Sequence, residues 1–297
     1  MIVNLFGKDL TVKDESCSLN GNPGTPIKEP YINMYVTMTN ACNAKCPFCC
    51  NEKNAGVKID FDYYKFYYLV HEIRKQITIN KLSFTGGEPS LDMDLLGRCV
   101  ETVKKTDKEV FTIINTNGIH LGELDKIAKY FDSIALSRHF YNDDINNEIF
   151  GTDTIAQSSD IEMFVHKDIL HLSCNLQKGY IDIPRKVMLY LEEASKLGVN
   201  DIGFVSLMPC NKYCKEKFID FTDVDFGAIE NLYISKEWNQ KTYCRCRNYL
   251  YMPKNEETDV DVVKVYTRYY VDPTHSLSTL VYDGKYLRQG FGGDIII

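Results

Sequence analysis

From Pro30 to about Pro209, short apolar runs alternate with longer stretches in which apolar residues recur at helical spacing. This rhythm is typical of βα units, in which helices connect parallel strands. We expect strands at six ranges: Tyr31–Thr39, Lys81–Thr85, Val110–Ile114, Ser133–Ser137, Ile169–Asn175 and Asp201–Leu207.

Three of the intervening stretches repeat apolar residues at i, i+3, i+4 and i+7, which places them on one helix face. The last of them lies between Pro184, suited to a helix start, and Gly198, suited to a helix end. The predicted faces are Phe66, Leu69, Val70 and Ile73; Leu124, Ile127, Ala128 and Phe131; and Val187, Tyr190, Leu191 and Ala194.

Six strands joined by helices form either an open, doubly wound sheet or an incomplete version of the eight-stranded barrel, and the pattern does not choose between them. Either way, reactive groups should gather at the C-terminal ends of the strands, where parallel βα architectures place their sites.

The two ends of the chain lack this rhythm. The turn-rich start predicts a small hairpin or arm. The end mixes turns, a short helix near Asp225–Tyr233 and β-rich runs at Val260–Val271 and Ser278–Tyr282. The predicted organisation is an N-terminal arm (1–28), an α/β domain (29–209) and a small cysteine-containing α+β extension (210–297).

Composition narrows the class of protein. With 297 residues, 44% hydrophobic and 25% charged, the chain is long enough to bury a substantial core. The net charge of -7 and the lack of a basic run disfavour a nucleic-acid partner. No apolar run reaches about 18 residues and no signal peptide is evident, so we expect a cytoplasmic protein without a membrane partner. In a reducing compartment, its 11 cysteines favour metal ligation or catalysis over disulfides.

Three of these cysteines follow the first predicted strand directly. Cys42, Cys46 and Cys49 are spaced by three and then two residues, so that their thiolates can converge on one metal centre. A four-iron cluster held by three thiolates would leave one iron open to a substrate or cosubstrate. A zinc site, which usually takes four protein ligands, and unligated thiols are the alternatives that spacing leaves open.

The spacing of these cysteines, with the aromatic Phe48 just before the last of them, resembles the cluster motif of radical S-adenosylmethionine (SAM) enzymes. The resemblance implies that Cys42, Cys46 and Cys49 hold a catalytic [4Fe-4S] cluster, that SAM chelates the fourth iron, and that Phe48 lies near the adenine. It also implies reductive cleavage of SAM to a 5′-deoxyadenosyl radical that abstracts hydrogen from a substrate. The electron would come from a donor such as flavodoxin or ferredoxin.

The later strand ends carry further residues of this resemblance. Gly86, Gly87, Glu88 and Pro89 resemble the glycine-rich element that contacts the SAM amino group, where bare backbone offers carbonyl acceptors to an ammonium. In isolation the same tetrad is an ordinary turn. Polar residues at strand ends can also be solvated or cap the next helix. By resemblance, we expect SAM contacts also from Thr116, Ser137, Arg138 (to the carboxylate, or to the substrate), Asn175 and Met208.

The stretch from Leu172 to Pro209 resembles the fifth and sixth units of the molybdenum-cofactor GTP-cyclising enzymes. Together the resemblances cover about Tyr31 to Pro209. They imply a partial (β/α)6 TIM-type barrel, which decides the choice that periodicity left open.

A second cysteine group lies in the extension: Cys210, Cys214, Cys244 and Cys246. Two close pairs suffice for a zinc ion or for a fully ligated iron–sulfur cluster. The extension resembles radical SAM domains that bind an auxiliary [4Fe-4S] cluster, although Cys-Arg-Cys is tighter than the usual spacing. Of the other cysteines, we expect Cys99 and Cys174 to be buried, and Cys17 and Cys50 to be solvent thiols or, less favoured, resolving or substrate-facing groups.

The expected function is radical chemistry on a small-molecule or peptide substrate. The alternative is a non-catalytic iron–sulfur or zinc protein with an electron-transfer or structural role. The element from Gly86 to Pro89 argues against it, because a carrier has no use for an amine-binding site beside an open cluster.

Overall fold

The computed structural model describes residues 2–12, 31–51, 55–57, 59–235, 246–254, 262–268 and 279–297. Within these ranges the strands form a two-stranded hairpin and an 11-stranded sheet. The order in the large sheet is β13-β12-β3-β4-β5-β6-β7-β8-β11-β10-β9.

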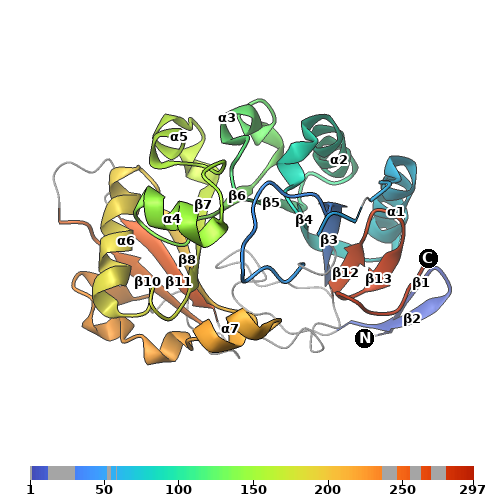
Figure 1. Cartoon of the computed structure of the whole chain (residues 1–297). Coiled ribbons are helices and arrows are strands. Elements are labelled where there is room, and N and C mark those ends of the chain that lie inside the picture. The colour runs from blue at the N-terminus through green and yellow to red at the C-terminus, as the bar shows by residue number, and fades with distance from the viewer. Residues whose placement is uncertain are drawn as a thin grey trace.

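The centre of the sheet consists of six parallel strands that pair in chain order. Figure 1 shows them as an arc with helices along its outer side. The sheet ends in β13 and β9 and does not close on itself, so the predicted partial barrel is confirmed. The six predicted strands are confirmed with small shifts at their ends. They are β3 (Tyr31–Thr39), β4 (Thr78–Gly86), β5 (Phe111–Thr116), β6 (Ser133–Ser137), β7 (Leu170–Leu176) and β8 (Asp201–Ser206).

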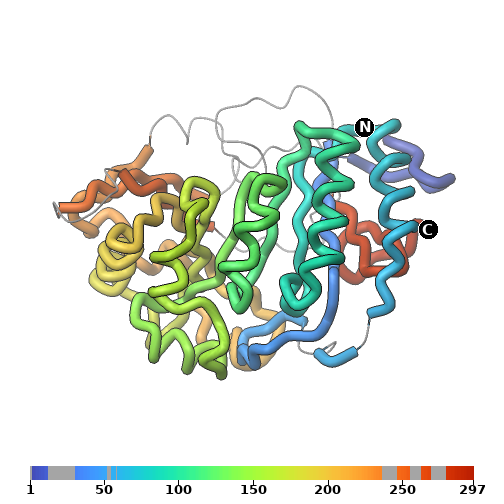
Figure 2. The backbone as a smooth tube through the Cα atoms, turned by 90° about the horizontal axis from the view of Figure 1, so that it is seen from above, coloured from blue at the N-terminus to red at the C-terminus, as the bar shows by residue number. Residues whose placement is uncertain are grey.

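Most of the helices lie along the outer side of this arc (Figure 2), whereas α7 (Lys212–Lys217) lies below it, away from the outer helices (Figure 1). Two of the three predicted apolar faces belong to α1 and α6, and all eight of their residues are buried. As expected, Pro184 occupies the first turn of α6. The described helices are α1 (Tyr63–Gln76), α2 (Met93–Thr106), α3 (Leu121–Leu124), α4 (Asp143–Phe150), α5 (Ser158–Met163), α6 (Pro184–Lys196) and α7 (Lys212–Lys217).

The third predicted face does not form one helix. The chain after α3 continues as turns and a 3-10 helix, Ala128–Tyr130, because the N–H groups of Lys126 and Ile127 bond three residues back rather than four. Leu124, Ala128 and Phe131 are nevertheless buried, since the tighter turns still direct these apolar residues to the core.

The region after residue 209 extends the sheet at both edges. β11 (Val263–Arg268) pairs in parallel with β8, and β12 (Thr279–Tyr282) pairs in parallel with β3. The helix predicted near Asp225–Tyr233 is a 3-10 turn, Phe226–Ala228, followed by a strand. The outer strands are β9 (Leu232–Ile234), β10 (Arg247–Tyr251) and β13 (Leu287–Gln289), all antiparallel to their neighbours. The predicted domain limits stay predictions.

The start of the described chain forms the expected hairpin from β1 (Ile2–Leu5) and β2 (Lys8–Thr11). Lys8 Nζ donates a hydrogen bond to the carbonyl of Ile295, so the hairpin contacts the other end of the chain, and both termini lie on the same side of the molecule (Figures 1 and 2).

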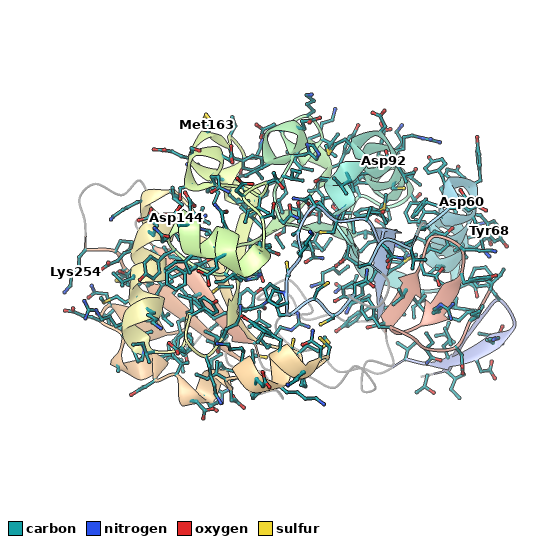
Figure 3. The ribbon with its side chains drawn as sticks, viewed as in Figure 1. Asp60, Tyr68, Asp92, Asp144, Met163 and Lys254 are labelled. Atoms are coloured by element: carbon teal, nitrogen blue, oxygen red, sulfur yellow. The ribbon has the colours of Figure 1, made fainter. Side chains whose placement is uncertain are left out.

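The outer surface is polar with scattered apolar side chains. Tyr68 and Met163 point outward from the helical layer and Lys254 from the opposite flank (Figure 3). No described helix has the length and apolar character that a bilayer crossing requires.

The contact between β8 and β11 provides a test of the extended sheet. Tyr266 of β11 stacks on His171 of β7, with ring centroids 5.1 Å apart, and its hydroxyl lies 2.8 Å from His171 Nε2. A Cβ on Gly203 of β8 would lie 2.2 Å from the Tyr266 ring. We expect Gly203→Ala to lower the free energy of unfolding by about 1–3 kcal/mol, measured by chemical denaturation, because the ring has to move.

The matched control for this substitution is Gly122→Ala in α3, where an added Cβ would meet nothing within 4 Å. Equal stability of the two variants would contradict the close contact between β8 and β11.

Candidate functional site

The loop after β3 brings the thiols of Cys42, Cys46 and Cys49 together. Burial raises the pKa of Cys46 to about 12, and the neighbouring Cys42 and Cys49 contribute to the rise. Burial also raises the pKa of Cys42, assisted by Glu88 and Cys49 and opposed by the Ala44 N–H, which lies 3.4 Å from the Cys42 sulfur. The three thiols of this loop are therefore close enough to influence one another's pKa.

This loop rests directly on the end of β4. The N–H of Gly87 donates to the Thr39 carbonyl at 2.6 Å, and the N–H of Glu88 donates to the Ala41 carbonyl at 2.8 Å. A Cβ on Gly86 would lie 2.2 Å from Thr39 O, and one on Gly87 would lie 2.0 Å from Ala41 O. The two glycines are therefore needed for the contact between the strand ends, besides any approach to a ligand.

Glu88 connects β4 to β5. Its side chain is 1% exposed, and Oε1 accepts hydrogen bonds from the Ser90 N–H (3.0 Å), the Ser90 hydroxyl (2.7 Å) and the Thr116 hydroxyl (2.7 Å). Oε2 accepts from the N–H of Asn117 at 2.7 Å. The structure thus directs Glu88 and Thr116 toward each other, and Pro89, which follows Glu88, is buried as well.

Asn117, which the sequence analysis did not single out, reaches the cysteine loop. Its Nδ2 donates to Asn43 Oδ1 at 2.8 Å and lies 3.9 Å from the Cys42 sulfur. Its position in the polar strand end Asn115–Gly118 was the available signal in the sequence.

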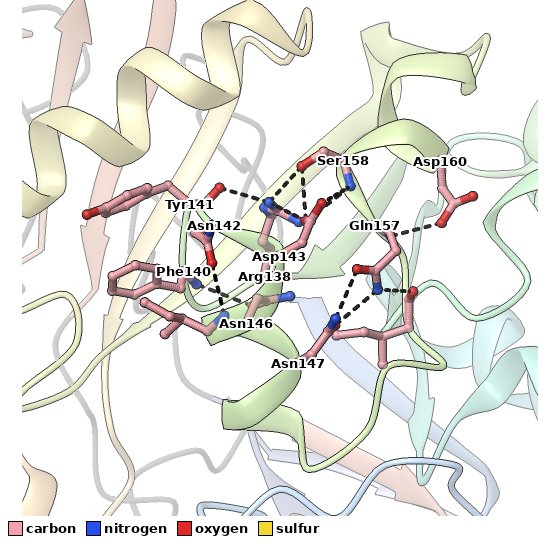
Figure 4. A network of polar contacts seen from close by, with 12 residues as sticks. Arg138, Phe140, Tyr141, Asn142, Asp143, Asn146, Asn147, Gln157, Ser158 and Asp160 are labelled. Carbon is pink, nitrogen blue, oxygen red and sulfur yellow. Dashed lines mark hydrogen bonds and ion pairs between the residues drawn. The ribbon is translucent and has the colours of Figure 1, made fainter.

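Arg138, at the end of β6, is buried in a network of polar contacts (Figure 4). Its Nη2 donates to the Tyr141 carbonyl and the Ser158 hydroxyl, both at 3.0 Å, and pairs with Asp143 Oδ1 at 2.8 Å. Partial burial would raise the pKa of Asp143, but Arg138 and Ser158 outweigh burial and lower it. Arg138 Nη1 is also buried and has no hydrogen-bond partner among the described residues. Its predicted contact with SAM stays a prediction.

An aromatic group lies beside this network. His139 stacks on Phe150 with centroids 4.9 Å apart, and Phe48 meets the His139 ring edge-on at 4.8 Å. The N–H of Asn175 donates to His139 Nδ1 at 3.1 Å, so the neutral ring carries its proton on Nε2. Burial lowers the pKa of His139 to about 3. Ser137, half-buried, ends β6 immediately before these residues.

The first pair of the second cysteine group packs against the back of the loop. The sulfurs of Cys210 and Cys214 lie 3.6 Å apart, and both thiols face the carbonyl oxygen of Phe48, at 3.9 and 3.5 Å. Cys246 is buried directly before β10, and Cys244 lies outside the described residues. Because β10 starts opposite Thr267 and β11 pairs in parallel with β8, Cys246 belongs to the edge where β8 ends.

Met208, predicted to contact SAM, has its sulfur 3.6 Å from that of Cys50. Cys50 is thus brought to the second cysteine group by the fold. The only signal for this in the sequence was its position next to Cys49.

With this geometry in place, comparison with known proteins gives a consistent result. Residues 36–161 match the model of the radical SAM superfamily. The similarity to that superfamily covers the cysteine loop and the ends of β3 to β6. The cofactors of this enzyme family are a [4Fe-4S] cluster and SAM.

Two curated relatives illustrate the similarity. The chain is 27% identical over 223 residues to a "Probable GTP 3′,8-cyclase" of Saccharolobus solfataricus, covering 72% of this chain and 70% of that protein. It is 32% identical over 98 residues to YydG of Bacillus subtilis, which is named for peptide biosynthesis, covering 32% of this chain and 30% of YydG.

Solved structures support the fold. The crystal structure of Streptococcus suis SuiB bound to S-adenosylmethionine matches with a TM-score of 0.52 and 17% identity, covering 65% of this chain. The match spans 44% of the SuiB chain, so it bears on the fold and not on the activity of the whole protein.

The backbone contact at Gly87 can be tested directly. We expect Gly87→Ala to displace the cysteine loop and to lower the iron that the protein takes up on anaerobic reconstitution at least severalfold, because an added Cβ would overlap Ala41 O. The control is Gly97→Ala in α2, where the nearest atom lies at an ordinary 3.5 Å. Full iron uptake by the Gly87 variant would show that the loop does not depend on this contact.

The buried His139 predicts acid sensitivity. Its pKa when folded, about 3, lies below the ordinary histidine value of 6.5, so the unfolded chain binds more protons. The stability that neutral His139 confers is therefore present above about pH 6.5 and is lost as the pH falls toward 3, by up to about 1.4 kcal/mol per pH unit. We expect His139→Gln to flatten the pH dependence of thermal stability between pH 6.5 and 5. Parallel curves for the two proteins would contradict a neutral, buried imidazole.

Proposed function

We propose that this protein reductively cleaves SAM at a [4Fe-4S] cluster held by Cys42, Cys46 and Cys49, and that the resulting 5′-deoxyadenosyl radical abstracts hydrogen from a substrate. The observation that carries the proposal is the convergence of these three thiols on a loop fixed against Gly86 and Gly87. An open cluster needs three thiolates on one side and room for a chelating cosubstrate on the other.

The residues present suit such a cluster. The converging donors are thiols, which iron–sulfur clusters use. Glu88, the carboxylate that influences Cys42, has its oxygens bonded to Ser90, Thr116 and Asn117 and is not available as a fourth ligand.

When bound, the cluster and SAM supply the electron transfer and the carbon–sulfur cleavage that generate the radical. The residues of the chain would bind and orient SAM and exclude water. Gly86 and Gly87 offer backbone acceptors for the SAM ammonium, and the buried Nη1 of Arg138 is a donor for its carboxylate or for the substrate. The rings of Phe48, His139 and Phe150 form an apolar wall that helps to exclude water.

The roles of the other predicted residues complete the proposal. Ser137 and Asn175 lie at the ends of neighbouring parallel strands, β6 and β7, which supports a shared contact with SAM. Glu88, Pro89, Thr116 and Met208 would shape the same pocket, with Glu88 and Thr116 acting through the strand ends that they connect.

An auxiliary [4Fe-4S] cluster in the extension would accept an electron from the substrate radical. Its proposed ligands include Cys210, Cys214 and Cys246, and Cys244 completes the group predicted from the sequence. Full ligation by four cysteines favours electron transfer over substrate binding, because no iron is left open.

The proposed substrate class is a small molecule or a peptide. The names of the two curated relatives, a GTP cyclase and a peptide biosynthesis protein, support these two classes. The electron donor would be a flavodoxin or a ferredoxin.

The proposal is tested by anaerobic reconstitution with iron and sulfide, followed by SAM and a strong reductant. We expect release of 5′-deoxyadenosine by the unmodified protein and its loss, by a factor of at least 100, in Cys46→Ala, because the cluster loses one of its three ligands. The control is Cys99→Ala, which removes a thiol buried in α2. Reconstituted protein that neither binds SAM nor releases 5′-deoxyadenosine would refute the proposal.

A further inference from the structure

The fold separates two cysteines that are adjacent in the sequence. The thiol of Cys49 interacts with those of Cys42 and Cys46. The thiol of Cys50 lies within hydrogen-bonding reach of Cys210 and close to Cys214, besides its neighbour in the sequence, Cys49. Neighbouring Cα atoms are about 3.8 Å apart. Two successive residues of the loop therefore direct their thiols to different groups, Cys49 to Cys42 and Cys46, and Cys50 to Cys210 and Cys214.

The group around Cys50 contains four sulfur atoms from two segments of the chain, the loop after β3 and the stretch that runs from the end of β8 into α7. Cys50 Sγ lies 3.6 Å from Met208 Sδ, and Cys210 Sγ lies 3.6 Å from Cys214 Sγ. Cys50 and Cys210 are exposed whereas Cys214 is buried, so one thiol of the group lies in the protein interior and two are accessible to solvent.

The backbone around this group is held in place independently of the thiols. Asn211 Nδ2 donates to the Pro47 carbonyl at 2.9 Å, and Asn211 Oδ1 accepts from the N–H of Cys214 at 2.8 Å. This side chain fixes the start of α7 against the loop that carries Cys50. The thiols of Cys210 and Cys214 meet the same loop at Phe48 O.

We propose that Cys50, together with Cys210 and Cys214, ligates the auxiliary iron–sulfur cluster, which then lies directly against the loop of the SAM-cleaving cluster. This inference rests on the proposed function, because it takes the second cysteine group to be an iron–sulfur site. Cys246, buried at the same edge of the sheet, would supply the fourth thiolate, so Cys50 would take the place of Cys244 in the ligand set predicted from the sequence.

The chemistry of the group suits an iron–sulfur cluster, because its donors are thiols and thiolates hold such clusters. Cys50 and Cys210 are exposed, so their side chains have room to turn outward from their close contact and to spread around a cluster. Zinc, which also takes thiolates, is the alternative that the experiment separates.

The experiment isolates the second site. In a protein with Cys42, Cys46 and Cys49 all changed to Ala, we expect anaerobic reconstitution to leave about four irons and four sulfides per chain. Adding Cys50→Ala should reduce both to below about one, as should adding Cys214→Ala. Adding Cys99→Ala in the same background should leave the iron and sulfide unchanged.

The iron and sulfide contents show whether Cys50 is a ligand and whether the second site holds a cluster. Retention of the full iron and sulfide after Cys50→Ala, with loss after Cys214→Ala, would remove Cys50 from the ligand set. Zinc without sulfide in the triple-alanine background would overturn the cluster itself. Cys50→Ser, which keeps the size of the side chain, separates loss of a ligand from misfolding, because it should lose the absorption of the cluster while retaining the thermal stability of the cluster-free protein.

Failure of the proposed function gives a different result. In that case the unmodified protein would contain no more iron than the triple-alanine protein, whatever Cys50 does.

Discussion

The site depends on two backbone hydrogen bonds between the ends of adjacent strands. The N–H groups of Gly87 and Glu88 donate to the carbonyls of Thr39 and Ala41, so the end of β4 positions the loop that carries the three converging thiols. The same turn places Glu88 where its carboxylate ties β4 to Thr116 and Asn117 at the end of β5. Since the strand ends approach too closely for a Cβ, no side chain larger than hydrogen can occupy these glycine positions without moving the loop.

Much of this fold could be predicted from the sequence, because parallel strands covered on both faces appear as short apolar runs. The six central strands and the apolar faces of α1 and α6 follow from local pattern alone. The apolar pattern predicted one helix from Leu124 to Phe131, which is wrong. In this stretch the backbone hydrogen bonds span three residues, although the apolar side chains still face the core. The pattern also could not show that β11 and β12 flank the central strands on opposite sides, because those pairings join segments far apart in the chain.

The local part of the candidate site could be predicted as well, whereas its long-range contacts could not. The spacing of Cys42, Cys46 and Cys49 is a local property, and a short loop brings such residues together in almost any fold. The contacts of Arg138 with Asp143 and Ser158 depend on where α4 and α5 pack, so they could not be predicted from local pattern. The approach of Cys50 to Cys210 likewise depends on the loop after β3 meeting the loop after β8 across the opening of the arc.

The pairing of β12 with β3 has a consequence for biosynthesis. β3 carries the cysteine loop, yet its outer neighbour is contributed by residues 279–282, which a ribosome makes long after β3. During elongation the nascent chain therefore presents an open strand edge, which invites association with other chains. The strand that carries the cysteine loop therefore gains its second neighbour only after residues 279–282 have left the ribosome.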